Sequence, residues 1–390
     1  MGAMTTNPLY ILAVLCVIVA AAEWLVRRTF LRHAGTALLG ILITAVVANI
    51  GLIPAGSSPE APVAVYDAIF AYVAPLAIFW LILNVNLRDV LRAGVPLVVL
   101  FCIGSLGTVA GVLAGMAAVD GARSIGENYN ALGGMFAGTY IGGSINFNAI
   151  ALEYDVVREG VLYAGSIAVD NVVTTVWMVA TLALPRLLAP LWPRAKGPAT
   201  PRGEVLLGIE DDTESLHPID LGLMLALGLF GLVVAEYVSE WLGARDLEIP
   251  FMLVLTIVAL VLAQTPLVAR LRGARVIGMF AVYLFLNVIG AFCDVGTLTE
   301  LGELGVTLLI FASIAVLVHG LITFGAARLM RLDLDMAAVA SQANVGGGTS
   351  ALALARSLGR GDLVLPAVLI GSLGNALGNF LGFWVAGSLL

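Results

Sequence analysis

About ten apolar runs, each close to the length of a membrane-crossing helix, dominate this chain of 390 residues. A helix needs about 20 apolar residues to cross the hydrocarbon core of a bilayer. Hydrophobic residues make up 60% of the sequence and charged residues only 12%, whereas soluble domains average about 45–50% and about 25%. The runs cover residues 8–26, 34–54, 63–86, 95–119, 158–184, 218–240, 250–267, 276–293, 304–325 and 363–388. The sequence therefore predicts an all-α polytopic membrane protein.

The remaining polar and sulfur-containing residues do not favour an enzyme or a cofactor site. The three histidines lie far apart and form no HExxH motif, and no pair of the three cysteines has the spacing of metal ligands. The N-terminus lacks the basic region and cleavage site of a signal peptide, so we expect the run at 8–26 to be a retained helix. We predict no enzymatic activity, no organic cofactor and no nucleic-acid partner.

Two further apolar runs are interrupted by glycine and cover residues 129–152 and 334–356. The spacing from Gly142 to Asn171 is 29 residues, and the spacing from Gly346 to Asn375 is the same. An offset of 204 residues therefore superposes both pairs without a gap. A competing offset of 206 residues aligns a later glycine–serine pair instead, so pairings past the broken runs stay open. The chain has the pattern of two copies of one design.

The positions of lysine and arginine predict the topology, because cytoplasmic loops carry an excess of both. Basic residues follow the first and third runs and occur throughout the polar linker at 187–216, which places these segments in the cytoplasm. Loop 120–128 then lies outside. Only an odd number of crossings fits between this loop and the linker, although two apolar runs lie there. The run 129–152 is therefore predicted to be re-entrant from the outer side.

The second half repeats this argument with the orientation reversed. Its broken run, 334–356, is predicted to enter and leave on the cytoplasmic side, because arginines flank it at both ends. Five crossings per copy is an odd number, so the copies have opposite orientations. We expect a first inverted repeat at 1–186, a cytoplasmic linker at 187–216 and a second inverted repeat at 217–390, with both termini outside.

Inverted repeats with broken helices at mid-membrane are typical of secondary transporters. Irregular backbone survives in a membrane only inside protein or beside a water-filled cavity. Two hairpins that enter from opposite faces bring their glycine tips together, where free N–H groups can bind an anion and C=O groups a cation. Glycine also allows a ligand to approach the main chain closely. The alternative is that these glycines serve only helix packing.

Three features of the sequence carry a family resemblance: the segment GGMFAGTYIGGSINFNAIA, the closing GSLGNALGNFLG and the overall length. They resemble the YjcL-like family of uncharacterised bacterial and plant multi-pass membrane proteins. The hairpins are more distantly similar to those of sodium/glutamate symporters and 2-hydroxycarboxylate (citrate) transporters. Here Gly346-Gly347-Gly348-Thr349 and Gly142-Gly143-Ser144-Ile145 depart from the GGxG signature of those families at its fourth position. The distant resemblance implies five helices per half, sodium coupling, an elevator mechanism and a homodimer.

The predicted site follows from the two hairpins and the helices after them. Asp170 is the sharpest candidate, because a carboxylate within an apolar run usually faces a cavity or a partner. We predict that it binds Na⁺ together with Asn148 and Asn171, or else that it carries a proton. The predicted substrate-binding residues are Gly142, Gly143, Ser144, Asn146, Asn344, Gly346, Gly347, Gly348, Thr349, Ser350 and Asn375.

The overall prediction is a sodium-coupled secondary transporter of the inner (plasma) membrane that carries a small organic solute. The alternatives are a proton-coupled transporter and a channel or facilitator. No arginine lies mid-membrane to bind a tricarboxylate, which favours a zwitterion or a small neutral solute. Asn84 and Asn287 form another repeated pair, with a structural or a functional role. His319 lies in an apolar run but has no counterpart in the other copy.

Overall fold

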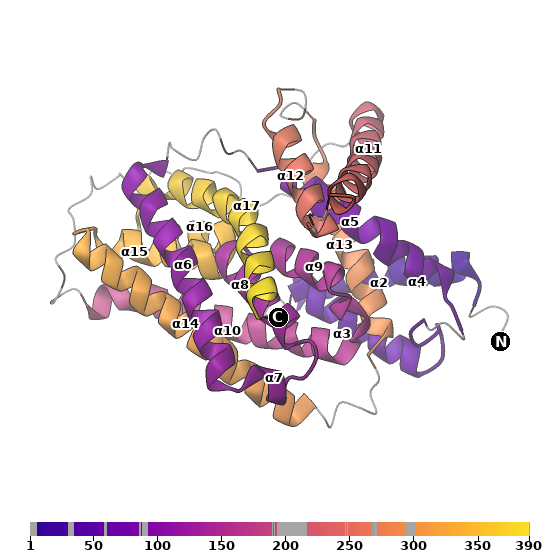
Figure 1. The fold of residues 1–390 in the computed structure, drawn as a ribbon, viewed down its shortest axis with the longest axis horizontal. Helices are drawn as coiled ribbons and strands as arrows, with labels where there is room; N and C mark the ends of the chain where they lie inside the picture. Colours follow the sequence, from indigo (N-terminus) through magenta and orange to yellow (C-terminus); the bar gives the residue numbers. More distant parts are fainter. Residues whose placement is uncertain are drawn as a thin grey trace.

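The computed structural model describes residues 6–29, 35–57, 61–85, 87, 93–188, 190, 192, 217–245, 247, 249–266, 268, 271–293 and 301–389. All regular elements in these ranges are helices, as the composition predicts (Figure 1). The predicted linker at 187–216 lies outside the described residues except for its first few positions.

Eight of the described helices are long and apolar enough to cross a membrane, and each coincides closely with a predicted run. They are α2 (Pro8–Arg28), the continuous crossing from α4 (Ala64–Ala68) through the π-helical turn Ile69–Val73 to α5 (Ala74–Ile82), α6 (Val95–Ala118), α10 (Gly160–Leu187), α11 (Pro218–Gly243), α13 (Ala274–Ala291), α14 (Leu301–Leu329) and α17 (Val364–Ser388). The chain is therefore a multi-pass membrane protein, and a lipid bilayer is its natural surrounding.

Two predicted crossings are shorter than the apolar runs that contain them. Helix α3 (Gly35–Asn49) has 15 residues and α12 (Phe251–Ala263) has 13, so at about 1.5 Å per residue neither reaches the roughly 30 Å of a hydrocarbon core. Gly51, with a φ of 79°, follows α3, and Pro266 follows α12. Both residues favour turns over continued helix, so apolar length overestimated these two helices.

The two predicted hairpins are present, and each is broken at glycine. The first consists of α8 (Tyr129–Gly142) and α9 (Ser144–Glu153), and the second of α15 (Leu334–Val345) and α16 (Gly347–Ser357). Gly143 has a φ of 98° and a ψ of −178°, a region that only glycine occupies readily. Gly347 has a φ of 75°. Glycine is therefore required at both breaks by the backbone itself.

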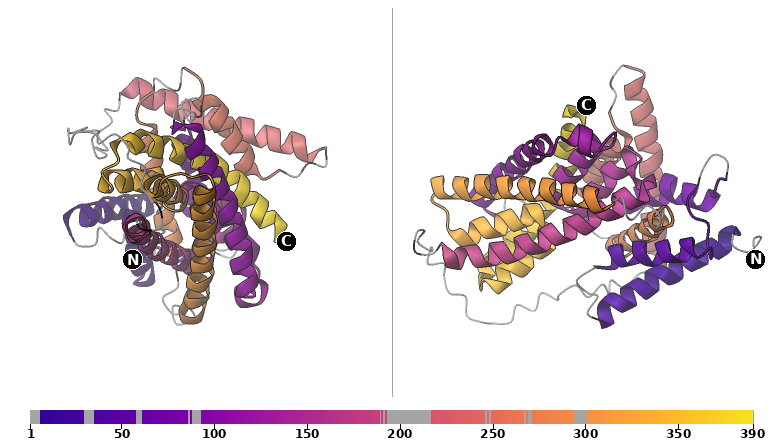
Figure 2. Two further views of the ribbon diagram at one scale, coloured as in Figure 1. Left: turned by 90° about the vertical axis from the view of Figure 1, so that its left-hand side faces the viewer. Right: turned by 90° about the horizontal axis from the view of Figure 1, so that it is seen from below.

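The helices pack as two bundles that lie side by side (Figures 1 and 2). The hairpin bundle contains α6, α8, α9, α10, α14, α15, α16 and α17, with the short helix α7 (Gly121–Ser124) at its edge. The flanking bundle contains α2, α3, α4, α5, α11, α12 and α13. Each half of the chain therefore gives its first three apolar runs to the flanking bundle and its later elements to the hairpin bundle.

A row of glycines on α6 brings this helix close to α14. Gly104, Gly107, Gly111 and Gly115 are spaced three or four residues apart and therefore lie on one face of the helix. A Cβ at Gly111 would overlap the backbone of Ala315 on α14. Small residues at such spacing let membrane helices pack at short range. This contact makes α6 and α14 part of the hairpin bundle.

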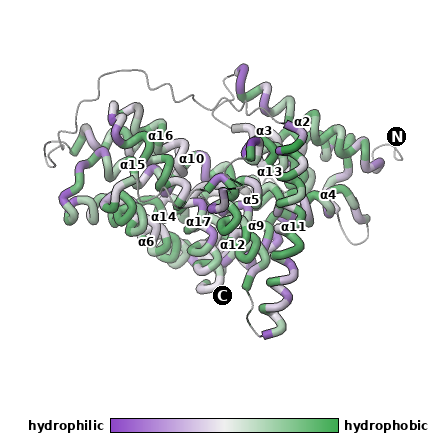
Figure 3. Tube along the Cα trace, turned by 90° about the horizontal axis from the view of Figure 1, so that it is seen from above, coloured by the Kyte–Doolittle hydropathy of each residue, from purple (hydrophilic) through white to green (hydrophobic). Residues whose placement is uncertain are grey.

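Apolar side chains cover most of the outer surface of the two bundles. Figure 3 shows hydrophobic residues along the bodies of the helices and hydrophilic ones mainly toward their ends. Leu9 on α2 and Phe230 on α11 are among the most exposed large apolar residues, at 78% and 71%. A membrane protein presents such side chains to lipid, in agreement with the composition.

Candidate functional site: the junction of the two hairpins

The tips of both hairpins lie on the middle of α17. A Cβ at Gly142, at the end of α8, would overlap the carbonyl group of Gly374. A Cβ at Gly371, one turn earlier on α17, would overlap the backbone of Gly348 in the second hairpin. A Cβ at Gly347 would lie 3.9 Å from the carbonyl oxygen of Gly142. Glycine in all three elements thus lets two hairpins, about 200 residues apart in sequence, meet at one point.

Asn146, in the first turn of α9, faces α17. Its Nδ2 donates to the carbonyl oxygens of Gly138 and Gly374, both at 3.3 Å. These two partners can only accept, so they fix which end of the amide faces them. The opposite atom, Oδ1, is buried and has no hydrogen-bond partner among the described residues.

Asn344, two residues before the break in the second hairpin, is held in the same way. Its Nδ2 donates to the hydroxyl of Ser105 at 2.9 Å and to the carbonyl oxygen of Ile141 at 3.5 Å. The carbonyl can only accept, so Nδ2 is again the atom that faces it. Its Oδ1 is buried without a partner among the described residues.

Each hairpin therefore holds one buried amide oxygen without a partner among the described residues, and that of Asn344 faces Gly104 on α6, where a Cβ would overlap it. A buried polar atom without a partner costs about 1–3 kcal/mol, and such atoms are rare in folded proteins. An amide oxygen accepts hydrogen bonds and coordinates hard cations such as Na⁺ or Ca²⁺. The junction can thus bind a cation or a ligand that brings hydrogen-bond donors.

Asp170 lies on α10, beside the first hairpin. Its carboxylate is half-buried and accepts a long hydrogen bond from Thr174 at 3.4 Å. The buried hydroxyls of Tyr140 and Tyr163 lie close enough to interact with its charge. Tyr163 also donates a hydrogen bond to Oδ1 of Asn148 on α9. This cluster joins oxygen atoms from α8, α9 and α10.

The predicted ligands of the first hairpin are therefore divided between two places. Asn146 and Asn148 are two residues apart on α9, so they point to nearly opposite faces of the helix. Asn146 contacts α17, whereas Asn148 contacts Tyr163 next to Asp170. The structure brings Asn148 and Asp170 together and places Asn146 in the hairpin junction instead.

The other predicted residues lie at the hairpin tips or on the helices behind them. Ser144 and Thr349 are exposed, one at each tip, and Ser350 donates to the carbonyl oxygen of Gly347 at 3.0 Å. Asn171 and Asn375 are half-buried, and no side-chain hydrogen bond joins either of them to another described residue. The predicted set therefore surrounds the junction without forming one continuous shell.

The repeated pair Asn84 and Asn287 has no common role in the structure. Asn84 donates to carbonyl oxygens of its own helix at 3.1 and 3.3 Å. Asn287 is buried in the flanking bundle, where Nδ2 donates to the carbonyl oxygen of Leu15 at 3.1 Å. A Cβ at Gly40 on α3 would overlap its Oδ1. Asn287 thus joins three helices of the flanking bundle, which is a structural role.

Sequence reasoning missed two buried amides near the junction. Gln342 on α15 accepts from Thr181 at 3.1 Å and donates to Ser350 at 3.1 Å, which ties the second tip to α10. Asn379 on α17 donates to Thr256 of α12 at 2.7 Å, and its Oδ1 is unpaired among the described residues. Asn379 could have been found from the sequence, because it lies one helical turn after Asn375 and therefore on the same side of the helix.

Three polar contacts between described residues join the hairpin bundle to the flanking bundle. The hydrogen bond between Asn379 and Thr256 is one of them. The carboxylate of Glu153, at the end of α9, accepts from the N–H groups of Phe251 and Met252 at 3.0 and 2.8 Å and so caps α12. Burial raises the pKa of this carboxyl, and the two N–H groups partly offset the rise. The third contact is an ion pair of 3.3 Å between Arg158 and Asp67.

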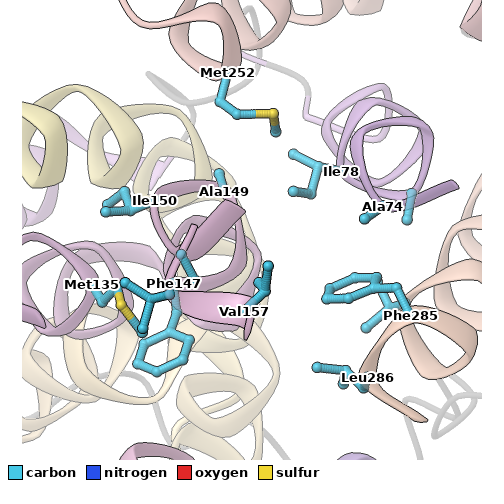
Figure 4. Packing of buried hydrophobic residues seen from close by; sticks show 14 of the residues in the cluster. Ala74, Ile78, Met135, Phe147, Ala149, Ile150, Val157, Met252, Phe285 and Leu286 are labelled. Atoms are coloured by element: carbon cyan, nitrogen blue, oxygen red, sulfur yellow. The ribbon is translucent and has the colours of Figure 1, made fainter. Parts of the chain in front are cut away.

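Apolar side chains of the described residues form much of the surface between the bundles. Figure 4 shows side chains of the first hairpin region opposite side chains from three helices of the flanking bundle. Those of the hairpin bundle include Phe147, Ala149, Ile150 and Val157, and those of the flanking bundle include Ala74, Ile78, Met252, Phe285 and Leu286. Apolar contacts are not directional, so they permit sliding more readily than a polar surface would.

A partly buried ion cluster closes the base of the second hairpin. The guanidinium of Arg360 lies 2.9 Å from Asp333, 3.2 Å from Asp335 and 2.7 Å from Asp362. The hydrogen bonds that Arg360 donates to Asp362 and Asp333 raise the pKa of its guanidinium above the usual range. Asp333 also accepts from the N–H of Met336 at 2.8 Å and so caps α15. The start and the end of this hairpin are thereby held together.

Comparisons with known proteins agree with this architecture. The chain is similar to the "Uncharacterized membrane protein YjcL" of Bacillus subtilis (strain 168), with 28% identity over 360 residues, which is 89% of this chain and 87% of that protein. The resemblance predicted from the sequence is thereby confirmed. The family described as "Protein of unknown function (DUF819)" matches residues 10–390, which is nearly the whole chain. This multi-pass membrane protein therefore belongs to the DUF819 family.

Proposed function

We propose that this protein is a sodium-coupled secondary active transporter of a small organic solute. The observation that carries the proposal is the hairpin junction. Two glycine-broken hairpins from opposite halves of the chain meet on α17, and each brings a buried amide oxygen that lacks a partner among the described residues. Broken backbone beside unpaired oxygens is what transporters use to bind a substrate and a coupling ion.

The order of elements supports an inverted repeat. In each half the second helix is short, namely α3 or α12. Two long crossings follow it, and after them comes a pair of helices broken at glycine. Each half also divides between the two bundles in the same way. In this proposal α3 and α12 are short crossings, completed by the apolar chain that follows each helix. Two copies with five crossings each would then have opposite orientations, so their hairpins would enter from opposite faces.

The coupling ion follows from the atoms available. A sodium ion needs several oxygen ligands, and the cluster on α8, α9 and α10 offers them at a place apart from Asn146 and Asn344. Asp170, with Asn148 and two tyrosine hydroxyls nearby, supplies the negative charge that would neutralise the ion. An empty carboxylate in a low-dielectric setting is costly, so cation binding and closure of the site are linked.

The substrate would bind at the tips beside these oxygens. The exposed hydroxyls of Ser144 and Thr349 and the glycine backbone of both tips offer hydrogen bonds to a small solute. The described residues that form the junction include no lysine or arginine. This favours a zwitterion or a small neutral solute over a tricarboxylate.

The movement would be that of an elevator, in which the hairpin bundle slides along the flanking bundle. The apolar surface between the bundles and its few polar contacts support this mechanism. The mobile unit would contain both hairpins with α10 and α17, which follow them in the sequence. It would also contain α6 and α14, because they pack in the same bundle. A homodimer that holds the flanking bundle still is expected from the distant family resemblance.

Proton coupling is the second candidate. Asp170 alone could take up a proton, and the tyrosine hydroxyls beside it could pass that proton on. The two candidates differ in what Asp170→Asn should do. A proton carrier loses coupling completely, whereas a sodium site keeps its amide and hydroxyl ligands and binds the ion more weakly.

The test is uptake of radiolabelled amino acids and carboxylates into proteoliposomes with an imposed sodium gradient. We expect uptake to follow the gradient, and Asp170→Asn to raise the sodium concentration for half-maximal uptake about tenfold or more, equal to about 1.4 kcal/mol. Asp120→Asn, at an exposed position outside the hairpins, is the matched control and should change nothing. Uptake that ignores sodium and follows a pH gradient would show that the sodium assignment is wrong, and downhill flux without either gradient would indicate a facilitator.

A further inference from the structure

His319 lies on α14 and is fully buried in the hairpin bundle. Its Nδ1 is 2.9 Å from the carbonyl oxygen of Gly104 and 3.0 Å from the hydroxyl of Thr108, both on α6. Its Nε2 is 2.9 Å from the hydroxyl of Ser341, on α15 of the second hairpin. The imidazole therefore contacts two different helices through its two nitrogens.

The partners of His319 decide which nitrogen carries the hydrogen. A carbonyl oxygen can only accept, so Nδ1 donates to Gly104, and Nε2 is left to accept from Ser341. The indole N–H of Trp177 donates to the Ser341 hydroxyl at 3.0 Å, which leaves that hydroxyl free to donate to the imidazole. The one hydrogen on Nδ1 is then shared between the carbonyl oxygen of Gly104 and the hydroxyl oxygen of Thr108, and Nε2 accepts from Ser341.

Thr108 extends this chain of bonds to the first hairpin. Its hydroxyl lies 3.0 Å from the carbonyl oxygen of Tyr140, which is two residues before the break at Gly142. It can accept from the Nδ1–H of His319, shared with Gly104, and donate its own hydrogen to the carbonyl oxygen of Tyr140, which is nearer than that of Gly104 at 3.2 Å. The chain of hydrogen bonds thus runs from Tyr140 through Thr108, His319 and Ser341, and it joins the two hairpins close to their tips.

We propose that His319 is a positioning residue that couples the two hairpins, so that a displacement of one tip changes the other. Ser341 is one helical turn before Asn344, and Tyr140 directly precedes Ile141, whose carbonyl oxygen accepts from Asn344. Both ends of the chain therefore lie next to the junction. The consequence for transport rests on the proposed function, because only a transporter needs its two tips to move in step.

The test measures communication between the hairpins and requires no transport. A cysteine at the exposed position Thr349, in a chain without the native cysteines, reports the accessibility of the second tip through its rate of maleimide alkylation. Thr108→Val removes the hydroxyl that reaches the first hairpin and keeps the shape of the side chain. We expect this distant change to raise the alkylation rate at position 349 about fivefold, the equivalent of one hydrogen bond.

The decisive comparison repeats Thr108→Val in a protein that carries His319→Phe. Coupling through the imidazole predicts that the valine then has no further effect, whereas an effect of unchanged size would overturn the proposal. The alkylation rate in SDS, where the cysteine is fully accessible, gives the maximum. A rate close to this maximum would show that the assay is saturated and cannot report a further increase. Thr44→Val is the matched control, because its hydroxyl is equally buried and bonds a backbone carbonyl at 2.8 Å in the flanking bundle.

The reverse experiment guards against a His319 variant that does not fold. Ser341→Ala removes only one hydroxyl from the second hairpin, and a cysteine at the exposed position Ser144 reports the first tip. Coupling is reciprocal, so the alkylation rate at position 144 should rise by a similar factor. No change there would overturn the proposal. Coupled labelling without sodium-driven uptake would support the coupling of the hairpins and contradict the proposed function. Sodium-driven uptake without coupled labelling would support the proposed function and contradict the coupling.

Discussion

The close approach of Gly142 to Gly374 makes Gly142→Ala the sharpest test of the hairpin junction. The new Cβ would overlap the carbonyl group of Gly374 and would lie 2.6 Å from Nδ2 of Asn146. Ordinary contacts between carbon atoms lie at about 3.5–4.0 Å. The obstructing atoms belong to the backbone of α17, so no change of rotamer relieves the overlap. Either α8 or α17 must move.

The size of the effect follows from this geometry. Overpacking costs about 1–3 kcal/mol where side chains can adjust, so a backbone obstruction should cost about 3 kcal/mol. Gly305→Ala is the matched control, since no atom lies within 4 Å of a Cβ at this position in α14. Alanine within a helix is more stable than glycine by about 1 kcal/mol, so the control should gain stability. The two variants should then differ by about 4 kcal/mol, which for a chain of this length is on the order of 5 °C in unfolding midpoint.

Gly143→Ala separates overlap from backbone strain. No atom lies within 4 Å of a Cβ at Gly143, but its φ of 98° and ψ of −178° should cost alanine about 1–3 kcal/mol. Thermal unfolding is monitored by intrinsic fluorescence in one detergent. The unfolding midpoint of Gly305→Ala should lie above that of the wild type, and the midpoints of both tip variants should lie below it. A Gly142→Ala protein as stable as the wild type would refute the contact between the first hairpin and α17.

Three further predictions follow from the described contacts and from the sequence. Glu153→Ala removes the side-chain cap of α12, so the free energy of unfolding should fall by about 1 kcal/mol and hydrogen exchange should rise in the first turn of α12, with Glu153→Gln less affected. Arg360→Gln removes a cation from three carboxylates, which should cost about 3 kcal/mol and raise exchange in both legs of the second hairpin while the first stays protected. In intact cells, a membrane-impermeant thiol reagent should label a cysteine at position 57 but not one at position 198, and the reverse pattern would contradict the predicted topology.

Apolar length and glycine position predicted most of the fold, because both act locally. A run of about 20 apolar residues fixes a crossing whatever it packs against, and glycine at Gly143 and Gly347 is required by the backbone at the breaks. The overestimated helices, α3 and α12, show where this reasoning fails. Their runs continue as apolar chain after the helix has ended, and hydropathy alone does not distinguish the two.

The site was predictable only in part, because its partners are mostly backbone atoms. Asn146 and Asn344 were found from their position beside the breaks. The sequence grouped Asn146 with Asn148, although helical geometry places them on opposite faces. It gave His319 no partner, since two of the atoms that define its role are a glycine carbonyl and a serine hydroxyl on distant helices. Such contacts leave no pattern in the spacing of residues.

Under the proposed function, the unpaired amides give a physical reason for strict coupling. Asn146 and Asn344 belong to different hairpins, and each leaves one buried oxygen unpaired among the described residues, at a cost of about 1–3 kcal/mol. A bound solute or ion that pairs one of these oxygens recovers its cost, so a site occupied at both hairpins recovers both. Binding at one hairpin alone recovers about half of this free energy. The loaded junction is therefore the state in which the hairpin bundle is most rigid, and a rigid bundle can slide past the flanking bundle without opening its site.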